Sequence, residues 1–330
     1  MSEVFILNAA VFSTLVFWGI WGVFDKLALK HGPPVLVLIA INSLAPLMPV
    51  FLLFFLYKLD AVSSLSAEVF GWTFLAGLSY FVSMLLYLWV LNKTEASLIL
   101  GLTSSYPIVL QFFSHLFLGE PLVPMRIAGS ILVALGIVVM GLSSRRLEKA
   151  GADNELNLPV WLAIIAATVL WGIWGVFDKK AIELSGAIEV FFCKVVWDNF
   201  FELALVAFVI FTVRTKSESA RDFIIGNFGT LFNATSGKLD RASFFAPLKS
   251  RGLWAPALVS AFCLYVGGIT YLLALSKATA SYVVVITGCY PLVMYIFALL
   301  ILKEAFNRVR LLGILLITGG GTLAQLTQGL

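Results

Sequence analysis

Long apolar runs separated by short polar connections dominate the pattern along this chain. A helix needs about 20 apolar residues to cross the roughly 30 Å hydrocarbon core of a bilayer. The runs are continuously apolar, without the two-residue alternation of a membrane barrel strand. Ten of them are predicted to be spanning helices: residues 4–29, 35–57, 69–91, 95–118, 124–143, 159–182, 187–213, 253–275, 279–302 and 307–326.

Composition supports an integral membrane protein. Of the 330 residues, 61% are hydrophobic and only 12% are charged, and the mean hydropathy is +1.00. Soluble domains carry about a quarter charged residues, so these values exclude a water-soluble enzyme. They equally exclude a disordered chain, which is polar and poor in aromatic residues. The net charge of +4 lies mostly in short connections and gives no support to nucleic-acid binding.

An internal repeat organises the chain. Residues 18–26 and residues 171–179 both read WGIWGVFDK. Later positions match in the same order, among them the Tyr-Pro pairs at residues 106–107 and 290–291. The later matches are further apart than the first, which locates an insertion in the polar connection at about 214–252.

The repeat predicts the domain organisation. A first five-helix repeat covers residues 1–143, a linker covers 144–158, and a second five-helix repeat with the insertion covers 159–330. Because five is odd, the second repeat enters the membrane from the opposite face. The predicted fold is therefore all-α, with ten transmembrane helices as two inverted five-helix repeats, an arrangement common in secondary transporters.

Several of these features resemble the drug/metabolite transporter superfamily, in particular its ten-helix EamA-type members. The resemblance rests on the Trp-Gly pair in the first helix of each half, a proline in each fourth helix, a glutamate at its end, and a Gly-rich fifth helix. The residues are Trp18, Gly19, Pro107, Glu120, Trp171, Gly172, Pro291 and Glu304. It implies metabolite transport by alternating access through a central cavity, with no single substrate. Asp25, Asp178 and the charged seventh span depart from the family pattern.

The seventh predicted span carries three charges on one helical stripe. Lys194, Asp198 and Glu202 are spaced by four residues, so they follow one another along one face. Each charge costs roughly 2.5–3.5 kcal/mol near the membrane centre. One interpretation is a Lys194–Asp198 salt bridge that helps the halves pack, with Glu202 reaching outward. The other is a cavity-lining site for a cationic or zwitterionic substrate, or for a coupled proton, since burial favours the protonated form of a carboxyl.

The repeated motif offers a second candidate site. Trp18, Trp21 and Asp25 share one helical face, and Trp171 and Trp174 occupy the same places in the second copy. An aromatic wall beside a carboxylate attracts cations. The alternative is an interfacial tryptophan belt, with Asp25 and Asp178 near the membrane surface. The neighbouring face, which carries Gly19 and Gly22, is expected to permit close helix contact.

Further polar residues in the spans are candidates for substrate contacts or for ordinary interhelical bonds. Pro107 and Pro291 are expected to kink the fourth-type helices and to serve as hinges. The remaining candidates are Asn42, Tyr80, Tyr106, Asn199, Tyr265, Lys277 and Tyr290. No catalytic residue, cofactor or metal-ligand set is predicted, and the three cysteines have no metal spacing.

The favoured function is a secondary transporter of a small organic metabolite or drug-like solute, either proton-coupled or an exchanger. The alternative is a non-transporting multi-pass protein, namely an adaptor, a receptor or an intramembrane enzyme. The expected partners are the small-molecule substrate and the lipid bilayer; oligomeric state stays open. Orientation also stays open, because the distribution of Lys and Arg places both termini outside the cytoplasm, whereas the resemblance implies cytoplasmic termini.

Overall fold

A computed structural model describes residues 3–58, 65–121, 123–148, 157–215, 229–232 and 241–325. Most of the predicted insertion at 214–252, and residues 149–156 of the predicted linker, lie outside the described residues. The first half of the chain holds α1 (Glu3–Leu29), α2 (Pro34–Asn42), η1 (Ala45–Leu47), α3 (Met48–Lys58), α4 (Ala67–Lys93), α5 (Ala96–Thr103), α6 (Tyr106–Leu118) and α7 (Pro124–Glu148).

The second half begins with α8 (Leu158–Leu184) and α9 (Ala187–Arg214). Three short pieces follow, η3 (Gly229–Phe232), α11 (Arg241–Phe245) and η4 (Ala246–Lys249). The half ends with α12 (Arg251–Leu275), α13 (Ala280–Thr287), α14 (Tyr290–Phe297), the π-helical turn η5 (Ala298–Leu302) and α15 (Arg308–Gln325). Seven helical segments of the described chain are long and apolar enough to cross a membrane, and two more are shorter apolar helices.

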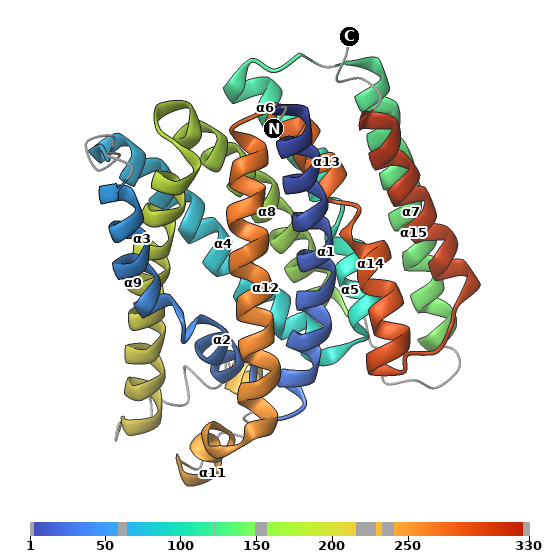
Figure 1. The fold of residues 1–330 in the computed structure, drawn as a ribbon. Coiled ribbons are helices and arrows are strands. Elements are labelled where there is room, and N and C mark those ends of the chain that lie inside the picture. The colour runs from blue at the N-terminus through green and yellow to red at the C-terminus, as the bar shows by residue number, and fades with distance from the viewer. Residues whose placement is uncertain are drawn as a thin grey trace.

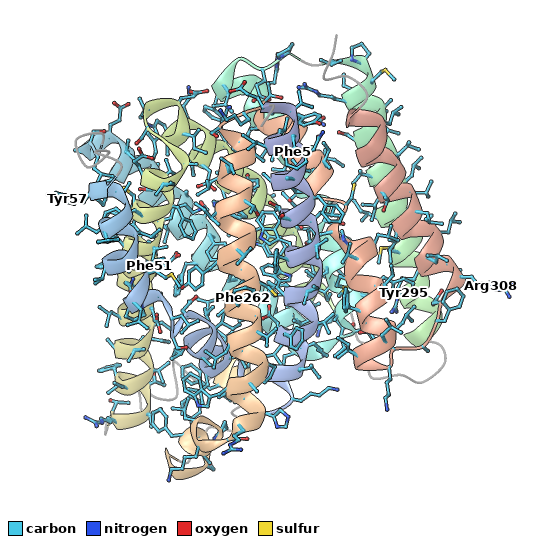
Figure 2. The ribbon with its side chains drawn as sticks, viewed as in Figure 1. Phe5, Phe51, Tyr57, Phe262, Tyr295 and Arg308 are labelled. Atoms are coloured by element: carbon cyan, nitrogen blue, oxygen red, sulfur yellow. The ribbon has the colours of Figure 1, made fainter. Side chains whose placement is uncertain are left out.

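The two halves are interleaved. Helix α1 of the first half packs along α12 of the second, and α8 of the second half packs along α4 of the first. Helices α7 and α15 stand side by side at one end of the molecule, and α3 and α9 lie at the other (Figure 1). Large apolar side chains such as Phe51, Tyr57 and Phe262 point away from the bundle, where a bilayer would surround them (Figure 2).

Three of the predicted continuous spans are interrupted. The second is divided between α2 and α3, the fourth between α5 and α6, and the ninth between α13 and α14. Pro107 and Pro291 lie in the first turns of α6 and α14. A proline there lacks only an N–H that has no helical partner in any case, so each proline starts a new helix instead of bending a continuous one.

Serine side chains satisfy the backbone at two of these breaks. The hydroxyl groups of Ser104 and Ser105 donate to the carbonyl oxygens of Gly101 and Leu102, at 2.6 and 2.8 Å. Ser43 does the same for Ala40, at 2.7 Å. Interrupted helices are tolerated at membrane depth only where such groups find partners inside the protein.

Glycines set the closest helix contacts, as the motif predicts. A Cβ atom on Gly19 would lie 2.5 Å from Cβ of Val293 in α14, and one on Gly172 would lie 2.7 Å from Cβ of Val109 in α6. The first glycine of each motif therefore brings its helix onto the broken segment of the other half. Gly136 in α7 lies against the backbone of Gly313 in α15 in the same way.

Candidate functional site

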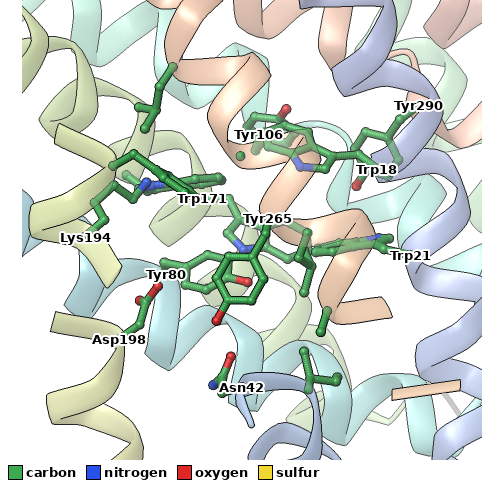
Figure 3. Close-up of a pocket in the computed structure, with 17 residues that line it drawn as sticks. Trp18, Trp21, Asn42, Tyr80, Tyr106, Trp171, Lys194, Asp198, Tyr265 and Tyr290 are labelled. Carbon is green, nitrogen blue, oxygen red and sulfur yellow. The ribbon is translucent and has the colours of Figure 1, made fainter. Parts of the chain in front are cut away.

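A cavity lies where the two halves meet, and both halves supply its walls. Figure 3 shows the lining side chains, which come from α1, α2, α4 and α6 of the first half and from α8, α9, α12 and α14 of the second. Its empty volume is about 830 Å³, the open space at its mouth included. It is lined by Trp18, Trp21, Ile41, Asn42, Tyr80, Tyr106, Trp171, Trp174, Phe191, Lys194, Asp198, Ala261, Leu264, Tyr265, Gly268, Leu272 and Tyr290.

Four tryptophans from the repeated motif form the aromatic part of this wall. Ring centroids are 5.8 Å apart for Trp18 and Trp174, and 6.2 Å apart for Trp21 and Trp171. Each pair joins the first position of one motif to the second position of the other, so the contacts are reciprocal. All four side chains are at most 9% exposed. The alternative of an interfacial tryptophan belt is therefore wrong.

Tyrosines extend the aromatic wall with the same reciprocity. Tyr271 lies 5.0 Å from Trp18, and its repeat counterpart Tyr87 lies 5.5 Å from Trp171, between ring centroids. The indole N–H groups of Trp21 and Trp171 are buried and donate to no described residue, and the hydroxyl of Tyr265 is likewise buried and unbonded. Buried polar groups without partners are uncommon in proteins, and these three belong to side chains that line the cavity.

The charged corner of the cavity is built differently from the sequence-based interpretation. Lys194 pairs with Asp178 of α8, at 2.7 Å between Nζ and Oδ2, and not with Asp198. Its ammonium group also lies 4.5 Å from the ring centroid of Trp174. Lysine and aspartate thus neutralise each other across two helices, and the predicted salt bridge within the seventh span is wrong.

Asp198 is left as the uncompensated charge on the wall. Within the described chain it has no ion pair and no hydrogen bond, and its carboxylate points into the space bounded by Tyr80, Asn42 and Tyr265 (Figure 3). The neighbouring hydroxyl and amide groups are hydrogen-bond donors for a solute or for the carboxylate itself. If the Lys194–Asp178 pair is counted as neutral, an ionised Asp198 gives the cavity a net charge of −1.

Glu202 lies one turn beyond Asp198 and does not line the cavity. It is buried, with 8% of its surface exposed, and its Oε2 atom has no partner in the described chain. The predicted outward reach of Glu202 is therefore wrong.

Asn199 and Lys277 lie outside the cavity. The side-chain amide of Asn199 donates to the carbonyl oxygens of Ala45 and Val195, at 2.9 and 2.7 Å, and so holds α9 against the break after α2. Lys277 pairs with Glu3 at the molecular surface, at 3.1 Å. Neither arrangement brings the side chain to the cavity.

The aspartates that end the repeated motif, Asp25 and Asp178, are fully buried among the helices. Asp25 accepts a 2.5 Å hydrogen bond from the hydroxyl of Ser260 on α12. Its counterpart Asp178 receives the ammonium group of Lys194 instead. Two identical motifs therefore end in different electrostatic environments.

The lysine after each aspartate closes a helix end. Lys26 donates to the carbonyl oxygens of Leu91 and Thr94 at the end of α4, at 2.6 and 2.7 Å. Lys179 donates to those of Leu275 and Ala278 at the end of α12, both at 2.9 Å. A cation beside unpaired C-terminal carbonyl groups is a favourable helix cap. These bonds connect α1 to α4 in the first half and α8 to α12 in the second half.

Two glutamates connect the halves near the ends of the broken segments. Glu120, after α6, accepts a hydrogen bond from the N–H of Ala280 at the start of α13, at 2.8 Å. Glu304, after η5, accepts one from the N–H of Ala96 at the start of α5, at 3.0 Å. Each broken segment therefore supplies the N-terminal cap of the other. The sequence resemblance singled out both glutamates but did not suggest this role.

Several wall residues were not among the sequence-based candidates. Phe191 precedes Lys194 by three residues and shares its stripe, so the helical period alone places it beside the charges. The apolar positions on α12 follow the same rule and share one face, namely Ala261, Leu264, Gly268 and Leu272. The sequence offers no reason to choose this face of α12 over another, because the helix is apolar on all sides.

Comparison with known proteins agrees with this architecture. The model of the EamA-like transporter family matches the chain twice, over residues 6–142 and 158–324. A solved crystal structure, titled only as that of a protein, matches over 97% of this chain and 96% of its own, with a TM-score of 0.63 and 15% sequence identity. At that identity the likeness concerns the fold alone. No curated protein matches the sequence. The family match and the apolar helices identify a multi-pass integral membrane protein.

Proposed function

Because the chain belongs to the EamA-like transporter family, we propose that it is a secondary transporter that carries a small organic solute by alternating access. The helical segments of the two halves are assigned ten membrane crossings in inverted orientation, with α2–α3, α5–α6 and α13–α14 each counted as one broken crossing. Transporters of this type bind their solute near the midplane between the repeats, where broken helices meet.

The observation that carries this proposal is the position of the cavity. It lies between the halves, and equivalent residues of the two motifs line it from both sides. A site shared by two equivalent halves is exposed to one face or the other when the halves exchange their contacts.

The reciprocal glutamates supply candidate closures at the two faces. The α13–α14–η5 segment begins at Ala280, where Glu120 binds, and ends just before Glu304, which binds Ala96. The two contacts therefore lie at opposite ends of one crossing. Release of one contact while the other holds would open the cavity to a single side, as alternating access requires.

The chemistry of the wall favours a cationic or zwitterionic solute. Asp198 offers an uncompensated carboxylate, and Trp18, Trp21 and Trp171 offer indole faces that attract cations. An anion would meet the Asp198 charge with no free cation opposite it among the lining residues, because Lys194 is already paired. A proton gradient or exchange for a second solute would supply the driving force.

The test is thermal unfolding of the detergent-purified protein against a panel of choline, spermidine, a zwitterionic amino acid, a neutral nucleoside and a sugar phosphate. A ligand at a hundred times its dissociation constant stabilises the protein by about 2.7 kcal/mol. We expect a cationic or zwitterionic member to raise the melting temperature of the wild type and to lose that effect in Asp198→Asn.

Glu202→Gln is the matched control, because Glu202 lies one turn away on the same helix but outside the cavity. The control should keep the stabilisation. A hit that survives Asp198→Asn would move the binding site away from Asp198. If no compound of the panel stabilises the well-folded protein, the result would favour a non-transporting role. Deletion of residues 216–228 would then be the next variant.

A further inference from the structure

The two copies of the nine-residue motif are identical in sequence, but the surroundings of their aspartates differ in one chemical respect. Asp178 has a cation, Lys194, at 2.7 Å. Asp25 occupies the equivalent position in the first copy, and Ile41 stands where the lysine would be. The sequence of the motif is the same, so the difference lies in what the neighbouring helices bring to it.

Asp25 is enclosed on every side. Its side chain has no exposed surface, and its Oδ1 atom accepts the 2.5 Å hydrogen bond from Ser260. Its Oδ2 atom is buried and makes no hydrogen bond. The hydroxyl of Tyr87, which is also buried and unbonded, faces the same carboxyl group.

No cation compensates this carboxyl group in the described chain. The titratable side chains that face it are Tyr80 and Tyr87 from α4 and Cys263 from α12. Helices α2 and α5 and the turn η5 also contact α1 and carry no titratable side chain, and the titratable side chains of α13 and α14 are tyrosines only, Tyr282, Tyr290 and Tyr295. The next residue, Lys26, directs its ammonium group to the end of α4.

An ionised carboxylate in such a place is strongly unfavourable, because a buried charge needs a partner to offset its lost hydration. The neutral acid fits the same surroundings. Its carbonyl oxygen accepts from Ser260, and its O–H group has the hydroxyl oxygen of Tyr87 as an acceptor. Four oxygen atoms, two from Asp25 and one each from Ser260 and Tyr87, are also too few for a hard metal cation, which takes six or more in proteins.

We propose that Asp25 is the proton-binding site of this transporter, distinct from the solute site at Asp198. This inference rests on the proposed transport function. When the halves exchange contacts and water reaches Asp25 from one face, the carboxylate takes one proton from a hydronium ion, forming an O–H bond at Oδ2, and it releases this proton to water when the site opens to the other face. Ser260 belongs to the opposite half of the chain. The hydrogen bond between Asp25 and Ser260 is therefore altered when the two halves exchange contacts.

Tyr80 connects this site to the solute cavity. It lines the cavity and lies near enough to both Asp25 and Asp198 for their charges to act on its hydroxyl group. The solute site and the proton site are therefore neighbours, and a positively charged solute at Asp198 repels a proton at Asp25. Binding of one opposes binding of the other, and such a mutual effect is the thermodynamic requirement for coupling.

Infrared difference spectroscopy between acidic and alkaline buffer tests the site without any solute. We expect the purified wild-type chain to show the carbonyl stretching band of a protonated carboxylic acid. One component of this band should disappear in Asp25→Asn and persist in Asp198→Asn. In Ser260→Ala the component should shift in frequency, because the acid loses its hydrogen-bond donor.

Several outcomes would overturn the proposal: an unchanged band in Asp25→Asn, loss of the component only in Asp198→Asn, or its loss when sodium replaces potassium in the buffer. If Asp25→Asn does not fold, Ser260→Ala decides, since an unshifted band would place the proton elsewhere. The measurement is independent of the ligand panel. If no panel compound stabilises the protein but the infrared band is present, the result contradicts the transport function and leaves the proton site standing. If a compound stabilises the protein but the Asp25 component of the band is absent, the result contradicts only the proton site.

Discussion

Glu304 accepts a hydrogen bond from the backbone N–H of Ala96, across the boundary between the two halves, at 3.0 Å. The same glutamate contacts Ser97 and the guanidinium group of Arg310, which is itself buried and also paired with Glu95. One carboxylate thus caps a helix of the first half while it compensates a buried cation of the second.

Removal of this carboxylate should destabilise the protein strongly. Glu304→Ala exposes the α5 N-terminus, at about 1 kcal/mol for a lost cap, and weakens the compensation of buried Arg310, for which breaking a buried pair costs about 3–5 kcal/mol. Glu304→Gln keeps an acceptor for the N–H of Ala96 and should cost less. Thermal unfolding of both variants measures the difference, and equal melting temperatures for Ala and Gln would contradict the capping role.

The Lys194–Asp178 pair should show strong thermodynamic coupling. Lys194→Met leaves Asp178 fully buried without a cation, at a cost of about 3–5 kcal/mol. The double variant Lys194→Met, Asp178→Asn removes both charges and should recover much of that loss. A double-mutant cycle of thermal unfolding measures the coupling. Additive effects of the two single substitutions would mean that the pair contributes no interaction of its own.

The aromatic wall should matter for a cationic solute more than for the fold. Trp18→Leu removes an indole face from the cavity and should weaken binding of the stabilising panel compound by about 0.5–2 kcal/mol, the range of cation–π contacts. Titration of the compound against melting temperature gives the change in affinity. Trp254→Leu is the control, since Trp254 bonds Leu248 outside the cavity; an equal loss in both variants would contradict a local effect.

Close contact between α7 and α15 should make Gly136 intolerant of any side chain. A Cβ atom there would lie 2.5 Å from the carbonyl oxygen of Gly313, so Gly136→Ala should lower the melting temperature. Gly71→Ala is the matched control, because nothing lies within 4 Å of its Cβ position. The control should be neutral, or stabilising by up to about 1 kcal/mol through helix propensity. A stable Gly136→Ala protein would show that the helices separate readily.

The sequence by itself determined the membrane class, the repeat and the approximate extents of the apolar helical segments, but not the breaks within three of them. A continuous apolar run in a membrane protein predicts a helix, because a helix satisfies its own backbone hydrogen bonds and so avoids the cost of burying unpaired polar backbone groups in lipid. The duplicated motif is visible in the sequence alone. The helical period also placed Lys194 and Asp198 on one stripe, and the cavity lies along that stripe. Those inferences need only local spacing and transfer energies.

Only the tertiary structure decided which groups meet across the helices. Periodicity assigns a residue to a face but not to a neighbour, so it left Lys194 beside Asp198 when its partner is Asp178 on another helix. The same limit hid the exchange of caps by Glu120 and Glu304. Identical letters at Asp25 and Asp178 acquire different chemistry because each lies against a different helix, and that packing is a property of the whole chain.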